Sequence, residues 1–186
     1  VDEILVTGWG DNGGEASQVS AMASILYFAE RRYHGKVDDA WLDRRARQCF
    51  GTSLEDLLAF DLPDALPECS VAKVDHPLAP AKDLLFNDPL ERLCDRHMIR
   101  ANVSAEYRAR AARLIAENPQ FGYAFESLGR LCSVLELKAT LGWSLYDAYR
   151  TGDRASLQQL AEETIPEILS RLDAFLVAFR KQWYHE

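Results

Sequence analysis

Residues 4–15 read ILVTGWGDNGGE, a short apolar run followed by a turn rich in glycine. The apolar run Ile4–Thr7 predicts a buried strand. The glycines after it give the backbone the freedom that a tight turn from strand to helix requires. Trp9, Asp11 and Glu15 therefore come at the C-terminal end of the predicted strand, which is the edge where parallel sheets and barrels bind ligands.

Two interpretations of this turn stay open from the residues alone. Trp9 can be an apolar plug, and Asp11 can cap the helix that comes next. Alternatively, the turn binds a sugar, because a sugar stacks on a flat aromatic face and donates its hydroxyl hydrogens to carboxylates. The second interpretation makes Trp9, Asp11 and Glu15 the candidate substrate-binding residues. No residue of the chain is a candidate for catalysis or for metal binding.

Helices are predicted directly after the turn, from apolar residues at spacings of three and four. They cover residues 16–34, 38–50 and 52–60. Residues 61–82 contain four prolines, which forbid a continuous helix and predict an irregular strap. Asp88 precedes Pro89, and this pair predicts the cap and the first position of another short helix.

Three long helices are predicted from Ser104 onward. They cover residues 104–118, residues 123–149, and the stretch from a cap at Asp153 to about Trp183. Pro166 must kink or split the third helix near Thr164, because proline has no N–H to donate. Short loops between long helices favour antiparallel neighbours, so this part of the chain predicts an up-down three-helix bundle.

Some side chains of the helical segments allow both a structural and a functional interpretation. A set of aromatic residues predicts core packing, with a cofactor pocket as the alternative; it comprises Phe125, Trp143, Tyr146, Phe175, Phe179 and Trp183. Lys138 lies among apolar residues, and we expect it to extend its charge toward a polar environment rather than to react. Arg44, Arg45 and Arg47 predict a solvated helix face, with an anion-binding site as the alternative.

The composition argues against several classes of function. The chain has 186 residues and a net charge of −8, which does not suit a nucleic-acid surface. No apolar run is long enough to span a bilayer, so no membrane partner is expected. The cysteines at positions 49, 69, 94 and 132 lack metal-ligand spacing and predict free thiols in a reducing, cytoplasmic compartment. No cofactor motif is present, and the chain does not begin with Met, which predicts a piece of a longer protein.

The turn Trp9–Glu15 resembles the last barrel strand of family 20 glycoside hydrolases, the exo-β-N-acetylhexosaminidases, and in particular a bacterial subgroup with a helical C-terminal domain. Residues 81–90, AKDLLFNDPL, are similar to a second segment of that subgroup. The resemblance implies a mainly α chain that begins with the last strand and helix of a (β/α)8 barrel. Residues 1–35 would be this barrel unit, residues 36–98 short helices and a Pro-rich strap, and residues 99–186 the antiparallel three-helix bundle.

The resemblance also implies an activity for the intact parent. In that family the acetamido oxygen of the substrate attacks the anomeric carbon, a Glu protonates the leaving oxygen and an adjacent Asp orients the acetamide. This Asp-Glu pair lies on an earlier barrel strand, and no such strand precedes Val1. The chain would therefore be an inactive C-terminal fragment whose parent acts on glycans that end in N-acetylhexosamine.

Within the sugar site, Trp9 would form part of the wall and Asp11 would accept a hydrogen bond from the 4- or 6-hydroxyl. Family members more often have Glu at this position, so Asp11 is one methylene shorter. The alternative function is a non-catalytic helical module for dimerisation or interaction, and a third is a helical regulator unrelated to sugars. We expect a homo-oligomer, because an isolated barrel strand exposes its edges to another copy.

Overall fold

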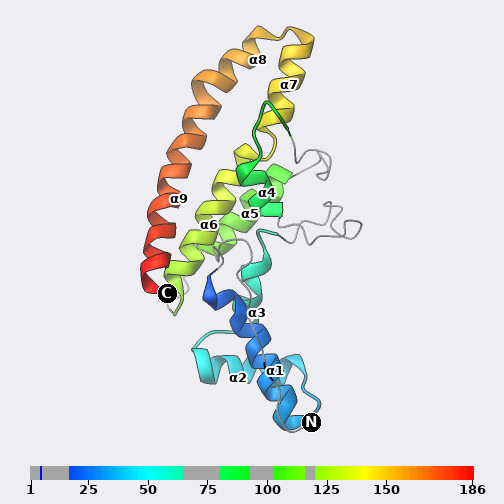
Figure 1. The fold of residues 1–186 in the computed structure, drawn as a ribbon, viewed down its shortest axis with the longest axis vertical. Coiled ribbons are helices and arrows are strands. Elements are labelled where there is room, and N and C mark those ends of the chain that lie inside the picture. Colours follow the sequence, from blue (N-terminus) through cyan, green and yellow to red (C-terminus); the bar gives the residue numbers. More distant parts are fainter. Residues whose placement is uncertain (1–4, 6–16, 65–79, 93–102, 116–119) are drawn as a thin grey trace.

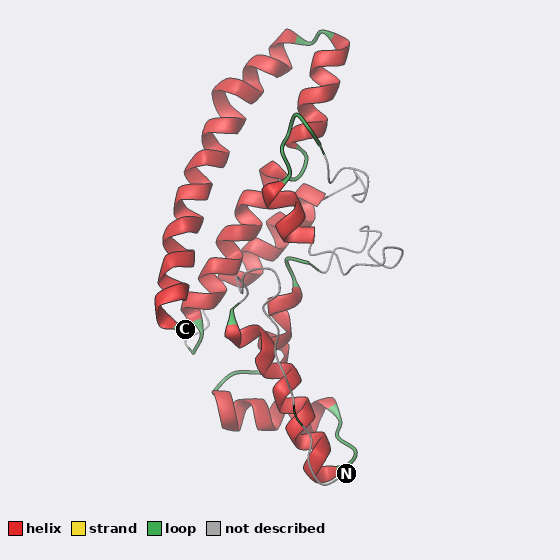
Figure 2. Cartoon of the chain, in the orientation of Figure 1, coloured by secondary structure: helices red, strands yellow, loops and turns green. Residues whose placement is uncertain are grey.

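The computed structural model describes residue 5 and residues 17–64, 80–92, 103–115 and 120–186 (Figure 1). Every regular element in these ranges is a helix, and they contain no strand (Figure 2). The candidate site residues Trp9, Asp11 and Glu15 lie outside the described residues, as does most of the predicted strand. Leu5, which is described, is 85% exposed and belongs to no strand. A barrel strand is buried by neighbouring strands, which the described residues do not supply.

The first helical segment agrees closely with the sequence pattern. It consists of the 3-10 helix η1 (Gln18–Ala21), α1 (Met22–His34), α2 (Asp39–Phe50), α3 (Leu54–Leu58) and the 3-10 helix η2 (Ala59–Asp61). The side chain of Asp38 caps α2 by accepting a hydrogen bond from the Trp41 N–H at 2.8 Å. Gly51 ends α2 in the left-handed conformation, with φ 69°. The predicted helix over residues 38–50 is therefore confirmed.

A further short helix, α4 (Pro80–Phe86), begins inside the stretch that was predicted to be irregular up to residue 82. Distant side chains hold both of its ends. Asp64 Oδ1 accepts a hydrogen bond from the Ala81 N–H at 2.8 Å. Lys138 Nζ donates to two carbonyl oxygens at the other end, those of Leu84 at 2.9 Å and Asn87 at 2.8 Å. An acceptor at the N-terminus and a cation at the C-terminus both suit the helix dipole.

The stretch after α4 departs from the predicted short helix. Asp88 does act as a cap, because its Oδ1 accepts hydrogen bonds from the N–H groups of Leu90 at 2.7 Å and Glu91 at 3.0 Å. However, residues 89–91 form only a turn, and Arg92 has a positive φ of 56°, which ends any right-handed helix. The predicted helix at Pro89 is therefore wrong within the described residues.

The C-terminal half is organised around α6. It contains α5 (Val103–Ile115), α6 (Gly122–Lys138), α7 (Leu141–Thr151), α8 (Arg154–Gln159) and α9 (Ile165–His185). Helix α6 packs between α5 and α9, while α7 and α8 form the far end of the molecule (Figure 1). The three long predicted helices are thus present, but the second is not continuous.

The break in the second predicted helix lies at Ala139 and Thr140, between α6 and α7. Thr140 has φ −106° and ψ 0°, which departs from the values of about −63° and −42° of a regular α-helix. Helix α7 then packs so closely on the turn after α4 that a Cβ on Gly142 would lie 3.0 Å from the Pro89 carbonyl oxygen. A prediction from periodicity could not detect this break, because the contact that accompanies it is distant in sequence.

Pro166 has the predicted effect on the third helix. Residues Leu160–Thr164 form a π-helical turn between α8 and α9, directly before the proline. A wider turn accommodates the missing N–H, so the chain changes its hydrogen-bond pattern and continues as one long curved path (Figure 1).

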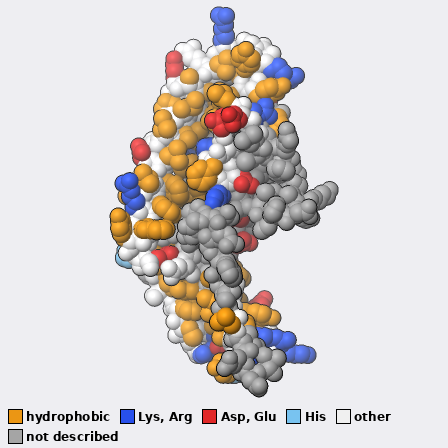
Figure 3. All heavy atoms as spheres, viewed as in Figure 1, with side chains coloured by type: hydrophobic (Ala, Val, Ile, Leu, Met, Phe, Trp, Pro, Cys, Tyr) orange, Lys and Arg blue, Asp and Glu red, His pale blue; other side chains and the backbone are white. Residues whose placement is uncertain are grey.

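The aromatic set is only partly in the core, which corrects the expectation of core packing. Phe125 is buried, whereas Tyr146 is 47% and Trp183 57% exposed. Hydrophobic side chains gather on the surface along α9 (Figure 3). Arg92 lies over the rings of Trp143 and Tyr146, with its guanidinium carbon 4.0 and 4.5 Å from their centroids. The rings on α7 therefore bind a cation of the chain itself.

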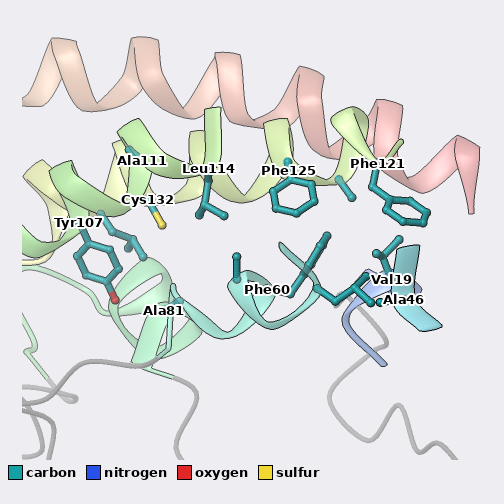
Figure 4. Packing of buried hydrophobic residues seen from close by; sticks show 14 of the residues in the cluster. Val19, Ala46, Phe60, Ala81, Tyr107, Ala111, Leu114, Phe121, Phe125 and Cys132 are labelled. Atoms are coloured by element: carbon teal, nitrogen blue, oxygen red, sulfur yellow. The ribbon is translucent and has the colours of Figure 1, made fainter. Parts of the chain in front are cut away.

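One hydrophobic cluster connects the N-terminal helices to the C-terminal ones (Figure 4). Phe60 of η2 and Phe125 of α6 pack edge to face with centroids 4.7 Å apart. Val19 of η1 and Ala46 of α2 belong to the same cluster. Tyr107 of α5 is completely buried, and its hydroxyl donates to a backbone carbonyl in the segment after η2. The cluster thus includes residues from each of the three segments predicted from the sequence, which are residues 1–35, 36–98 and 99–186.

Candidate functional site

After the candidate sugar-binding turn, the first residue that the structure describes is Ser17, which caps η1. Its Oγ accepts a hydrogen bond from the Val19 N–H at 3.2 Å. The same hydroxyl donates to Oε1 of Glu186, and the Gln18 N–H donates to Oε2 of Glu186 at 2.8 Å. The residue directly after α9 is therefore bonded to the start of the helix that the turn leads into. We call this contact the Ser17–Glu186 junction.

The electrostatics of the junction favour a carboxylate. The N–H groups at the start of a helix are unpaired and carry partial positive charge, which stabilises an anion there. Next to it, the ring of His185 stacks on Tyr123 of α6, with centroids 4.8 Å apart and planes 16° from parallel. Burial and the charge of Glu186 raise the pKa of Tyr123. These groups fasten α6 and α9 to the start of η1, and they position the backbone next to the turn.

A second polar cluster lies at the other end of α1. Glu30 is 6% exposed and accepts hydrogen bonds from Trp41 Nε1 at 2.8 Å and Arg45 Nε at 2.7 Å. The hydrogen bond from Arg45, together with that from Trp41, lowers the pKa of Glu30. His34 Nε2 lies 3.4 Å from the same carboxylate. Because both donors, Trp41 and Arg45, belong to α2, Glu30 joins α1 to α2. Its carboxylate is already paired and is therefore not a free acid.

The arginine cluster of α2 contains no vacant anion site. Arg45 bonds Glu30, and Arg47 Nε donates to Asp43 at 2.9 Å. Arg44 places its guanidinium carbon 5.4 Å from the centroid of the Trp41 ring. Each guanidinium therefore has a partner within the chain, which supports the interpretation of this cluster as a helix face.

A cleft with a volume of ≈ 520 Å³ lies between α2, α3 and α5. Of the three carboxylates that line it, those of Asp39, Asp43 and Glu55, the last two are already in use. Asp43 accepts from the Leu54 N–H at 2.9 Å as well as from Arg47, and Glu55 pairs with Arg113 at 2.8 Å. An acid or base for catalysis needs a perturbed pKa and free access to a substrate. The described part of this cleft therefore offers no pair of catalytic carboxylates.

Metal, thiol and membrane features of the described residues give no second candidate site. These residues place no group of three or more His, Cys, Asp or Glu side chains around a common point where an ion could bind. Cys49 and Cys132 are free thiols, and burial raises the pKa of Cys132 to about 12, which leaves it unreactive. None of the helices within these ranges is both long and apolar enough to cross a bilayer.

Sequence reasoning predicted a turn at residues that the structure does not describe, and it missed the Ser17–Glu186 junction. Glu186 is 169 positions from Ser17, and no motif links the two. The position of Ser17 after a predicted Gly-rich turn was a usable signal for a helix cap. No signal in the sequence indicated that Ser17 also bonds Glu186.

Comparison with known proteins agrees with the helical architecture. A search of curated proteins gave no match. The family model described as Glycoside Hydrolase 20C C-terminal domain matches residues 55–186, from α3 to the end of α9 and Glu186. This match covers more than half of the 186 residues and confirms the resemblance to family 20. The chain therefore belongs to the glycoside hydrolase 20C family, and residues 55–186 are its C-terminal domain.

Proposed function

We propose that the chain is the C-terminal part of an exo-β-N-acetylhexosaminidase, which hydrolyses terminal N-acetylhexosamine by the substrate-assisted retaining mechanism in the intact parent. The family match over residues 55–186 is the observation that carries this proposal. The turn that precedes η1 adds a Trp and two carboxylates of the kind that bind sugars. The chain itself lacks the catalytic Asp-Glu pair, so it is inactive alone.

In this proposal the chain contributes binding and positioning. Trp9 forms part of the wall around the terminal sugar, Asp11 accepts a hydrogen bond from one of its hydroxyls, and Glu15 is the third contact. The Ser17–Glu186 junction supports this role, because it fixes the backbone directly after the turn. A displacement of a binding group by about 1 Å can reduce the rate by about a hundredfold, so such fastening matters for activity.

The test is Asp11→Ala in the full-length parent. Loss of a charge-assisted hydrogen bond costs about 1.5–3 kcal/mol, so we expect kcat/KM to fall about 10- to 150-fold. Asp11→Glu, which has the length that is usual in the family, should retain most of the activity. Asp39→Ala, at an exposed position on α2, is the matched control and should change nothing. Unchanged kcat/KM in Asp11→Ala would remove Asp11 from the sugar site.

We place the parent in the cytoplasm as part of this proposal. One observation supports it: Cys49 and Cys132 are free thiols, and a reducing compartment keeps thiols in that state. The net charge of −8 supports a protein that does not bind nucleic acid.

A second candidate function is a helical module for dimerisation or interaction. The specific observation in its favour is the outer face of α9, where large apolar side chains such as Leu176, Trp183 and Tyr184 are exposed. Both functions can belong to one protein, since the helical domain of an enzyme can also assemble it.

A further inference from the structure

The outer face of α9 has the spacing of a helix that packs against another helix. Leu172 and Phe179 are half-buried, while Leu169, Leu176 and Trp183 are 57%, 44% and 57% exposed. These five residues succeed one another at intervals of 3, 4, 3 and 4, which is the heptad spacing of coiled coils. We call them the α9 stripe.

The stripe is distinct from the face that packs on α6. Ile168, Ala178 and Gln182 are the buried residues of α9. With 3.6 residues per turn, they lie roughly 60° to 140° around the helix from the centre of the stripe. Val177 and Tyr184 of the same helix are also exposed, at 69% and 87%. Hydrophobic side chains gather on the surface along α9 (Figure 3). Exposed apolar areas that extend along a whole helix are typical of interaction surfaces.

The charges of α9 indicate which partner fits. Glu167 and Arg171 pair with each other at 2.7 Å, and Lys181 pairs with Glu126 of α6 at 3.1 Å. Asp173 and Arg180 remain, and neither makes an ion pair with any residue the structure describes. They have opposite signs and lie seven residues apart, so both occupy the same heptad position next to the stripe.

This arrangement is complementary to itself in one orientation. If two α9 helices pair antiparallel about a two-fold axis beside Val177, Leu176 of each copy packs against Phe179 of the other. The same register places Asp173 of each copy beside Arg180 of the other. A two-fold interface must match itself in this way.

A parallel pair lacks this match of charges. In a parallel coiled coil, Asp173 and Arg180 would lie beside the positions of Ile168 and Phe175 in the other copy, which are uncharged. The two charges next to the stripe would then have no partner across the interface. The distribution of charge on α9 therefore favours the antiparallel orientation.

We propose that α9 is the interface of a homodimer, in which the stripes of two copies pack antiparallel and two Asp173–Arg180 ion pairs fix the register. The occupant of the exposed face is thus a second copy of this chain. The proposal deepens the second candidate function and rests on it. It does not depend on sugar hydrolysis.

The test is the oligomeric state of the full chain and of its charge-reversal variants, measured by sedimentation equilibrium over a range of concentrations. We expect the unmodified chain to be a dimer. Asp173→Arg and Arg180→Asp should each raise the dissociation constant about tenfold or more, since like charges then face each other twice. The double variant restores opposite charges and should return the dissociation constant to near its original value.

Both residues are exposed, so the variants should fold, and the far-UV circular dichroism spectrum verifies this. Tyr149→Glu is the matched control, because Tyr149 is an apolar residue of α7 that is 79% exposed and lies outside the stripe. A monomeric unmodified chain would overturn the proposal. Single variants that dimerise as tightly as the unmodified chain, or a double variant that stays weakened, would overturn it as well. Hydrolytic activity of the parent is a separate measurement, so failure of one proposal leaves the other intact.

Discussion

Glu136 of α6 joins three helices, and replacing it tests how the C-terminal domain is held together. Its carboxylate accepts hydrogen bonds from Arg108 Nε of α5 at 2.7 Å and from Arg171 Nη1 of α9 at 2.9 Å. Its side chain is 13% exposed. Glu136→Gln keeps the shape of the side chain but removes the charge, so both bonds lose their ionic component.

The magnitude depends on the exposure of the two arginines. Arg108 is 72% exposed, so solvent screening limits its contribution to at most about 1 kcal/mol. Arg171 is 25% exposed and also bonds Glu167, so its bond to Glu136 contributes about 1–2 kcal/mol. We expect a total loss of about 2 kcal/mol. For a chain of this length, that loss lowers Tm by about 4–8 °C.

Thermal unfolding followed by circular dichroism measures this effect, and Glu126→Gln is the matched control. Glu126 joins the same two helices, α6 and α9, through Lys181 at 3.1 Å, but the two side chains are 39% and 54% exposed. An exposed pair contributes less than about 1 kcal/mol, so Tm should fall by no more than about 4 °C. Equal shifts for the two variants would refute the idea that Glu136 is the central connection.

The pH dependence provides a second measurement on the same proteins. Burial raises the pKa of Glu136, but the hydrogen bonds from Arg108 and Arg171 lower it more, so the net shift is downward from 4.5. A carboxyl group with a lowered pKa stabilises the folded state above its unfolded pKa, and this contribution is lost as the pH falls through the folded pKa. The difference in Tm between the unmodified chain and Glu136→Gln should therefore be largest near pH 7 and should shrink below about pH 4. A difference that grows in acid would contradict this reasoning.

Three further predictions concern other parts of the domain. Lys138→Met removes both hydrogen bonds at the C-terminal end of α4, and urea unfolding should show a loss of about 1–3 kcal/mol; an unchanged midpoint would exclude this capping role. Gly142→Ala normally favours a helix, but here the new Cβ lies 3.0 Å from the Pro89 carbonyl oxygen, so we expect Tm to fall. A rise in Tm would show that α7 can move away. Cys132 should resist iodoacetamide in the folded chain at pH 8 while the exposed Cys49 reacts, as peptide mass mapping can show; equal labelling would contradict the burial of Cys132.

The elements that the sequence predicted well are those determined by neighbouring residues. Helix α2 has its cap at Asp38 and its glycine stop at Gly51 within a few positions of the apolar stripe, so periodicity and capping rules were sufficient. Pro166 acts on the hydrogen bonds of its own helix, and the π-helical turn before it was expected as a kink or split.

The elements that the sequence did not predict depend on distant contacts. Helix α4 has its ends bonded by Asp64 and Lys138, and Lys138 is 54 positions away from the carbonyl oxygen of Leu84. The break between α6 and α7 occurs where Gly142 packs on Pro89. Tertiary contacts of this kind override local preference, and a single sequence does not reveal them.

The region of the candidate site shows the same limit. The turn at Trp9 and Asp11 stays a prediction, made from groups that are contiguous in the sequence and lie outside the described residues. The junction between Ser17 and Glu186 could not be predicted, since it forms only when α9 has run the length of the domain and returned to η1.

The most direct test of the proposed function is hydrolysis of p-nitrophenyl N-acetyl-β-glucosaminide by the full-length parent and by this chain, measured side by side. We predict an active parent and an inert chain, because the proposal places the catalytic Asp-Glu pair in a part of the parent outside this chain. A parent that hydrolyses neither this substrate nor its galacto analogue would contradict the hexosaminidase proposal, and activity in the chain alone would contradict the placement of the catalytic acid.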